Sequence, residues 1–299
     1  MKVLTFDIEE WFHILDHPGS QSVESWDKFP SRLKAGVETI LEMLSVSNQK
    51  ATFFCLGWVA EKHPDVIRTI DNAGYHIATH SYAHQLAYTQ SPNEFREDLR
   101  RSIGTLQEIT GKAIDCYRAP GFSITSENLW AFEVLIAEGI KIDCSLFPAS
   151  RAHGGLPNIK SAFPSVGKWG VDQLKLLPIN TKQILGRKIV YSGGGYFRLF
   201  PHLLIHRWFG DEPYVMTYFH PRDFDFGQPV ISGLSAFRRF KSYVGIQGAR
   251  QKLARLLSAY KFVDVKDADS NIEWASAPNI DLRTGTSLEL FPNIVRRQP

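Results

Sequence analysis

The strongest constraint on the fold is an alternation, along most of the chain, between short apolar runs and stretches of helical periodicity. Residues 51–56 and 215–219 are compact strand-like runs, whereas the apolar residues of segments such as 31–46 and 246–260 recur every three or four positions. Seven or eight strands alternating with helices predict an α/β fold with a parallel sheet, either a (β/α) barrel or a doubly wound sheet.

Several of these apolar runs end in a polar or charged residue. The residues at such strand ends are Asp7, His80, Arg118, Asp143 and His220. In (β/α) barrels, catalytic groups lie at the carboxyl ends of the strands. The sequence therefore predicts a site assembled from side chains that are far apart in the chain.

Two of these strand ends suggest a metal. His80 and His84 stand four residues apart after a predicted strand, and two neutral imidazoles need only one more protein ligand to form an open zinc site. Asp7 and Glu9 share one face of the first strand, because side chains at i and i+2 point the same way. Two carboxylates on one face are costly unless a cation or a shared proton relieves them, although a solvated strand end is the alternative.

Composition bounds the class of protein. The 299 residues are 43% hydrophobic and 22% charged, as in soluble globular proteins. A net charge of +3 is too small to indicate nucleic-acid binding, and no apolar run approaches the ~20 residues of a membrane span. Because the chain starts with a strand-like run, no signal peptide is expected. The three widely spaced cysteines (Cys55, Cys116, Cys144) are expected to be buried, reduced thiols. These features predict a cytoplasmic protein with one barrel domain over residues 1–267 and a tail over 268–299.

Four separated signals resemble, in order, the motifs of the polysaccharide deacetylase family, the NodB-homology or carbohydrate esterase family 4 enzymes. They are Thr5-Phe6-Asp7, His80-Ser81-Tyr82-Ala83-His84, Arg118-Ala119-Pro120-Gly121 and Tyr218-Phe219-His220-Pro221. The resemblance covers roughly residues 3–265. The details around Glu9 and after His220 are similar to a branch with a C-terminal extension that is often found with bacterial surface-polysaccharide genes.

The resemblance implies a distorted (β/α) barrel that holds one metal ion, usually zinc, through His80, His84 and a carboxylate. The common family pattern has two adjacent aspartates, of which the second binds metal, but Ile8 stands at that position here. Glu9 is then the expected ligand, in agreement with its shared face with Asp7, and Glu10 is the lesser candidate.

The resemblance also assigns catalytic roles. Asp7 is the expected general base, and Arg118 would hold it ionised and oriented. The backbone N–H of Gly121 would help the metal to stabilise the oxyanion, and His220 would protonate the departing amine. Asp143 is a candidate for orienting His220.

The expected reaction is removal of an N-acetyl or related N-acyl group from an amino sugar. The substrate would be an oligosaccharide or a nucleotide- or lipid-linked sugar, contacted by Trp11, Phe122 and Tyr196, although Trp11 is equally suited to core packing. Two alternatives are an allantoinase-like or cyclic-imide amidase of the same fold and a non-catalytic carbohydrate-binding module. The sequence does not indicate an oligomeric state.

Other features have plainer interpretations. His202 and His206 stand four apart in a predicted helix without a nearby carboxylate, and are expected to be packed or solvated. His13, His17 and His153 lie in predicted loops that could line the cleft. Residues 226–263 hold seven cations and no acid, which fits a solvated helix face or, alternatively, an anionic sugar substrate or a membrane surface. The cations are Arg238, Arg239, Lys241, Arg250, Lys252, Arg255 and Lys261.

Overall fold

The computed structural model describes residues 1–15, 18–20, 22–150, 153–159, 162–231 and 233–287. The strands are β1 (Lys2–Val3), β2 (Thr5–Ile8), β3 (Thr52–Cys55), β4 (His76–Thr79), β5 (Cys116–Tyr117), β6 (Ile142–Asp143), β7 (Ser165–Trp169), β8 (Asp172–Leu176), β9 (Lys182–Ile184), β10 (Arg187–Ile189), β11 (Val215–Met216), β12 (Asn279–Asp281) and β13 (Thr286–Ser287). The α-helices are α1 (Val23–Trp26), α2 (Leu33–Ser47), α3 (Gly57–Lys62), α4 (Pro64–Asn72), α5 (Pro92–Thr110), α6 (Trp130–Ala137), α7 (Gly194–Leu199), α8 (His202–Asp211), α9 (Ala236–Tyr243), α10 (Ile246–Ala259) and α11 (Val265–Asn271). Short 3-10 turns are η1 (Pro18–Ser20), η2 (Ala87–Thr89), η3 (Pro120–Phe122), η4 (Pro221–Phe224) and η5 (Trp274–Ser276).

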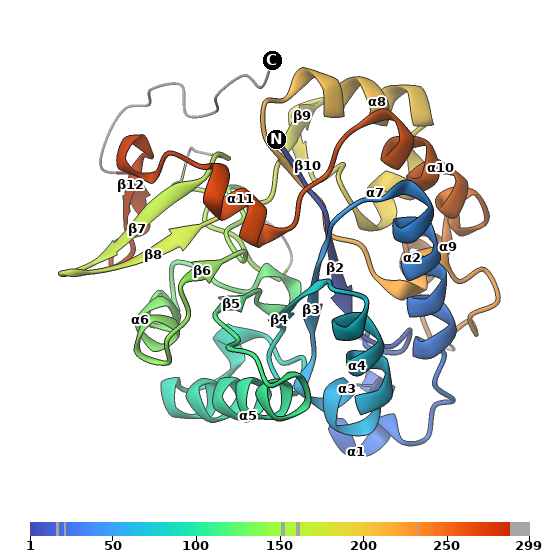
Figure 1. Ribbon diagram of the computed structural model, residues 1–299, viewed down its shortest axis with the longest axis horizontal. Coiled ribbons are helices and arrows are strands. Elements are labelled where there is room, and N and C mark those ends of the chain that lie inside the picture. Colours follow the sequence, from blue (N-terminus) through green and yellow to red (C-terminus); the bar gives the residue numbers. More distant parts are fainter. Residues whose placement is uncertain (16–17, 21, 151–152, 160–161, 232, 288–299) are drawn as a thin grey trace.

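The predicted α/β fold with a mostly parallel sheet is confirmed. The main sheet has the strand order β13-β12-β7-β8-β6-β5-β4-β3-β2, and the six strands from β8 to β2 are parallel. On the other side of β2, Phe6 bridges to Phe219 in parallel, and β1 pairs with β11. The strand that leads into His220 therefore flanks the first strand of the sheet, as in a distorted barrel with helices around its outside (Figure 1).

The predicted tail does not begin at residue 268. That boundary falls inside α11, and β12 pairs in parallel with β7. Burial explains the difference, because Ile280 and Leu282 are fully buried in an apolar cluster with Leu174 and Leu176. The last twelve residues of the expected tail, 288–299, lie outside the described residues. Strand β7 pairs antiparallel with β8, which interrupts the parallel order on this side of the sheet before β12.

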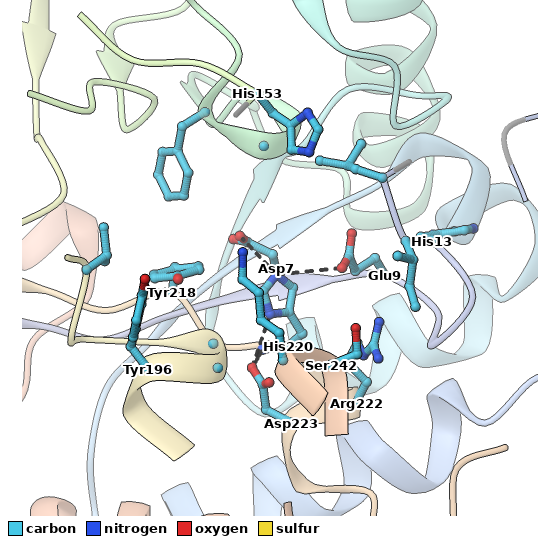
Figure 2. A pocket seen from close by; sticks show the side chains of 18 of the residues that line it. Asp7, Glu9, His13, His153, Tyr196, Tyr218, His220, Arg222, Asp223 and Ser242 are labelled. Atoms are coloured by element: carbon cyan, nitrogen blue, oxygen red, sulfur yellow. Dashed lines mark hydrogen bonds and ion pairs between the residues drawn. The ribbon is translucent and has the colours of Figure 1, made fainter. Parts of the chain in front are cut away.

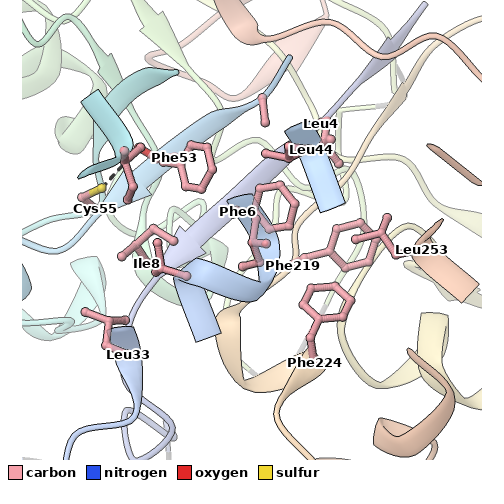
Figure 3. Close-up of a cluster of buried hydrophobic side chains, with 14 of the residues drawn as sticks. Leu4, Phe6, Ile8, Leu33, Leu44, Phe53, Cys55, Phe219, Phe224 and Leu253 are labelled. Carbon is pink, nitrogen blue, oxygen red and sulfur yellow. Dashed lines mark hydrogen bonds between the residues drawn. The ribbon is translucent and has the colours of Figure 1, made fainter. Parts of the chain in front are cut away.

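The first strand explains how the site is oriented. Leu4, Phe6 and Ile8 point into a cluster that includes Leu33 and Leu44 of α2, so the intervening residues Thr5 and Asp7 point to the opposite face (Figure 3). Phe6 also stacks on Phe53 of β3, with ring centroids 5.3 Å apart. Apolar packing on one face thus directs the Asp7 carboxylate into the barrel.

The helices differ in how they are buried. Helix α5 starts with a capping box between Ser91 and Glu94 and ends at Gly111 in the left-handed conformation, as its sequence predicts. Helix α9 has no buried side chain and exposes Phe237 and Phe240. None of the helices that the structure describes is long and apolar enough to cross a membrane. All three cysteines are buried and free.

Candidate metal centre and active site

Glu9, His80 and His84 come together at the carboxyl ends of β2 and β4. All three are buried, and one ligand atom from each lies within 4.8 Å of the others. Among the described residues this is the one such grouping of three His, Cys, Asp or Glu side chains. The structure therefore brings together the three residues that the sequence assigned to a metal.

The donor atoms fit a divalent metal. His80 Nδ1 lies 2.7 Å from the carbonyl oxygen of Arg118, and because a carbonyl only accepts, Nδ1 carries the proton and Nε2 keeps its lone pair. Burial lowers the pKa of His80 to about 4, so this imidazole is neutral at pH 7. Glu9 Oε2 lies 2.6 Å from His84 Nε2, yet it has no partner with hydrogen-bond geometry among the described residues. Two ligand atoms this close to each other, without hydrogen-bond geometry, are suited to bind one cation together.

Electrostatics keeps the Glu9 carboxylate charged. Burial by itself opposes ionisation, but His84, His220 and His80 outweigh it and hold the pKa of Glu9 well below its usual range. Two imidazoles and an ionised carboxylate are the ligand set of many open zinc sites.

The loop that carries the two histidines is held by α5. Ser81 and His84 adopt positive φ angles of 69° and 51°, which are unusual for residues other than glycine. Asp98 of α5 accepts hydrogen bonds from the backbone N–H groups of Tyr82 and Ala83, at 2.8 and 2.9 Å. Asp98 is a positioning residue that the sequence analysis did not single out, because nothing in its own segment marks it.

The choice between Glu9 and Glu10 follows from strand alternation. Glu10 points away from the histidines and accepts hydrogen bonds from the Ser31 hydroxyl and, at 3.1 Å, from the backbone N–H of Arg32. Glu10 therefore stabilises the start of α2. Ile8, which stands where the family commonly has a ligand, is fully buried in the apolar cluster.

Asp7 lies beside the trio and is held by Arg118. The fully buried Arg118 donates from Nη1 to Asp7 Oδ1 at 2.6 Å and to the Thr5 hydroxyl at 2.8 Å. Its guanidinium also lies over the ring of Phe54, 4.1 Å from the centroid. This bond fixes one oxygen of Asp7, and the other, Oδ2, lies 3.8 Å from His220 Nε2.

His220 is oriented by Asp223, and the expectation for Asp143 is wrong. His220 Nδ1 lies 3.1 Å from Asp223 Oδ2, whereas Asp143 accepts from the hydroxyl and the backbone N–H of Ser145 at 2.6 and 3.0 Å. Asp143 ends β6, several strands away from β2 in the sheet, while Asp223 belongs to the turn η4 that directly follows His220. The i, i+3 spacing after His220-Pro221 is a capping pattern, and it was the signal that could have identified Asp223.

Burial and charge oppose each other at His220. Burial disfavours the protonated ring, but the charges of Glu9, Asp223 and Asp7 outweigh it and raise the pKa of His220 to about 9. The imidazole is therefore positioned to hold a proton close to Asp7.

These side chains line one cavity of about 660 Å³, which is within the usual range for ligand sites (Figure 2). Gly121, Phe122 and Tyr196 line it as expected, together with His13 and His153, while His17 lies outside the described residues. Gly121 has a φ of +62°, and a Cβ atom there would approach Leu15 Cδ1 to 2.7 Å, so the position requires glycine. The role of its backbone N–H stays a prediction.

Two other expectations are resolved by packing. Trp11 does not line the cavity; it is buried against Phe12 and Phe29, and its Nε1 donates to the carbonyl of Pro30 at 2.9 Å. It is a core residue because its ring packs with the apolar cluster beneath β2. His202 and His206 are neighbours on α8, with ring centroids 5.9 Å apart, and no third ligand joins them among the described residues.

Parts of the chain match known protein families. A family model described as polysaccharide deacetylase matches residues 16–135, and one described as a domain of unknown function (DUF3473) matches residues 144–269. The peptidoglycan-N-acetylglucosamine deacetylase of Bacillus cereus is 36% identical over 95 residues, which are 31% of this chain and 34% of that protein. The peptidoglycan deacetylase of Helicobacter pylori is 26% identical over 113 residues, which are 38% of each chain. The chain thus spans little more than a third of the length of these relatives.

Solved structures share the fold over most of the chain. A crystal structure from Mycobacterium smegmatis, described as a candidate polysaccharide deacetylase, has a TM-score of 0.61 at 21% identity and covers 90% of this chain and 88% of that one. A carbohydrate esterase family 4 pseudoenzyme from Bacillus anthracis has a TM-score of 0.50 at 13% identity, covering 89% of this chain and 64% of that one. The family model and the relatives lead to one conclusion: residues 16–135 of this chain belong to the polysaccharide deacetylase family.

Proposed function

We propose that this protein is a metal-dependent hydrolase that removes an N-acetyl or related N-acyl group from an amino sugar. The observation that carries the proposal is the position of the Asp7–Arg118 pair, directly next to Glu9, His80 and His84 and facing His220. A base, an acid and a metal-ligand set thus line one cavity. These are the groups that amide hydrolysis requires.

Glu9, His84 and His80 through its Nε2 would hold the metal, which in such sites supplies an activated water and polarises the amide carbonyl. Asp7 would accept the proton of the attacking water, because the hydrogen bond from Arg118 fixes the orientation of its carboxylate beside the metal ligands. His220, oriented by Asp223, would donate a proton to the departing nitrogen. The products are a carboxylate, such as acetate, and a free amine on the sugar.

Zinc is the metal that we propose, because two imidazoles and one carboxylate with space for water are typical of catalytic zinc. We also propose a cytoplasmic location and a surface-polysaccharide precursor as substrate. Three buried, free cysteines support a reducing compartment.

The test is metal content of the purified protein together with acetate release from N-acetylglucosamine oligomers and from UDP-N-acetylglucosamine. One zinc per chain and release of acetate are expected, and the Glu9→Ala variant should show neither. Zinc without acetate release from either compound, but with hydrolysis of a cyclic imide, would favour a small-amide hydrolase instead. Absence of metal after reconstitution with zinc would contradict the proposal and point to a binding module.

A further inference from the structure

Arg222 is a cation at the cavity whose charge the protein leaves without a direct partner. It follows His220 by two residues and lines the same cavity. Among the described residues, none accepts a hydrogen bond from the Arg222 guanidinium and none forms an ion pair with it within 4.0 Å. Its Nη2 atom is buried and has no hydrogen-bond partner. The donors of a partly buried guanidinium are normally satisfied, because unmet donors cost free energy.

The acids near Arg222 are engaged elsewhere. Asp7 is held by Arg118, and Glu9 faces the two histidines. Asp223 bonds His220 through Oδ2 and lies 3.2 Å from Arg198 Nε through Oδ1. Glu9 and Asp223 attract the Arg222 charge, but none of these three carboxylates forms an ion pair with it within 4.0 Å.

Two more cations line the same cavity from α9, Arg238 and Lys241. Buried Arg198 holds this exposed helix in place, because its Nη1 and Nη2 donate to the carbonyls of Ser242 and Lys241 at 2.8 and 3.2 Å. Figure 2 shows Arg222 and Ser242 on the side of the cavity that carries His220 and Asp223, away from His153.

The cation-rich segment 226–263 is thereby divided. Arg250 pairs with Glu42 at 2.7 Å, and Lys252 donates to three backbone carbonyls, so these two have structural partners. Arg238 and Lys241 line the cavity, whereas Arg250 and Lys252 do not.

A structural role for Arg222 is the alternative. Its guanidinium lies 5.8 Å from the centroid of the Tyr243 ring, which is within cation–π range. Such a contact engages the face of the guanidinium and leaves its in-plane N–H donors without acceptors. Stacking on Tyr243 would orient the guanidinium but would leave its N–H donors without hydrogen-bond acceptors.

We propose that Arg222, with Arg238 and Lys241, forms an anion subsite beside the catalytic centre, so that the preferred substrate is an N-acyl sugar that carries a carboxylate or a phosphate. This inference rests on the proposed deacetylase function. Arginine suits both anions, because its planar donors bind two oxygens at once. The subsite would place the charged substituent next to His220 and the amide next to Glu9 and Asp7.

The test compares sugars that differ in charge, by calorimetric binding to the metal-loaded protein. N-acetylmuramic acid and UDP-N-acetylglucosamine supply the carboxylate and the phosphate, and N-acetylglucosamine is the neutral reference. At least one anionic sugar is expected to bind about 10- to 100-fold more tightly than the neutral one at low salt, with the preference shrinking as salt rises. Which of the two is preferred identifies the source of the anion.

Arg222→Gln should abolish most of this preference, and Arg222→Lys should restore part of it. Arg239→Gln is the matched control, because it removes the same charge from an exposed position of α9 that does not line the cavity. If Arg222→Gln fails to fold by circular dichroism, the Arg238→Gln/Lys241→Gln double variant takes its place and should also lose most of the preference.

Equal binding of neutral and anionic sugars would overturn the inference. So would a preference that the Arg222→Gln or the double variant retains, since an anion bound only to the metal behaves that way. The failure of the proposed function looks different: Arg222-dependent binding of the anionic sugar without acetate release would retain the subsite and reject the deacetylase reaction.

Discussion

Asp223 accepts two hydrogen bonds from His220 through one oxygen, from the backbone N–H at 3.0 Å and from Nδ1 at 3.1 Å. Its other oxygen faces Arg198. A single carboxylate thus fixes the tautomer of His220, directs Nε2 toward Asp7 and Glu9, and connects the site to the arginine that holds α9. The first prediction follows from this contact.

Asp223→Asn should lower kcat about 10- to 100-fold, the usual cost of losing a carboxylate that orients a functional histidine. The Asp223 charge and hydrogen bond help to raise the pKa of His220, so their loss lowers it. If protonated His220 is the acid, the alkaline limb of the kcat profile moves to lower pH. Asp143→Asn is the control and should leave that limb in place. If the alkaline limb of the kcat profile is unchanged in Asp223→Asn, His220 is not the general acid.

Glu9→Ala should lose the metal, whereas Glu10→Ala should keep it. Glu9 Oε2 faces His84 Nε2, while Glu10 bonds Ser31 and the start of α2. Removing a direct ligand should weaken zinc affinity by ~100-fold or more, since even outer partners cost 10- to 100-fold. Glu10→Ala should instead destabilise the fold by about 1 kcal/mol, like the loss of a helix cap. Competition with a chelator and thermal melts measure the two effects, and metal loss in Glu10→Ala would refute the assignment.

Asp7→Asn should bind zinc with wild-type stoichiometry and lose about 10²- to 10⁴-fold in turnover, the usual contribution of a general base. The amide keeps the size of the side chain but cannot accept the proton. Metal analysis and acetate release on the same preparation separate the two roles. Near-normal turnover in this variant would exclude Asp7 as the base.

Asp98→Ala should weaken zinc binding without removing a ligand. Its carboxylate anchors the backbone of Tyr82 and Ala83, between the two histidines, and the positive φ angles of Ser81 and His84 depend on that anchor. We expect about a tenfold loss of affinity by chelator competition. Glu97→Ala, at the neighbouring position of α5, is the control. Equal affinity in Asp98→Ala and wild type would show that the loop holds its shape unaided.

Asp143→Asn should stabilise the protein relative to wild type, increasingly so as pH rises. Burial raises the pKa of Asp143 from 3.8 to about 7. Between these values the unfolded chain is ionised while the folded chain keeps the proton, so this group's contribution to stability falls as pH rises through the window. Asparagine does not ionise, so the substitution removes this loss of stability, which is at most roughly 4 kcal/mol for a pKa shift of this size. Thermal melts at pH 4.5, 6 and 7.5 should show a growing difference in Tm, and a constant difference would contradict the raised pKa.

Local patterns in the sequence determined much of the fold and of the site. Alternation along β2 places Asp7 and Glu9 together and Ile8 and Glu10 on the other face, because successive side chains of a strand must point in opposite directions. The strand ends after β2, β4, β5 and β11 converge because neighbouring parallel strands end at the same edge of a sheet. The alternation depends on covalent geometry alone, and the convergence follows from the parallel α/β fold that the sequence predicts.

Contacts between distant elements were decided only by the tertiary structure. Trp11 is a core residue because Phe29 and the Pro30 carbonyl fold onto it, and residues 279–281 are a strand because β7 offers them an edge. Asp98 and Arg198 matter through backbone groups on other segments, which no pattern of their own reveals. The partner of His220 is a local exception, because the i, i+3 capping pattern that places Asp223 beside it is present in the sequence. Side-chain alternation is fixed by covalent geometry, but the choice of partner depends on which segments pack together, and only the folded chain supplies that information.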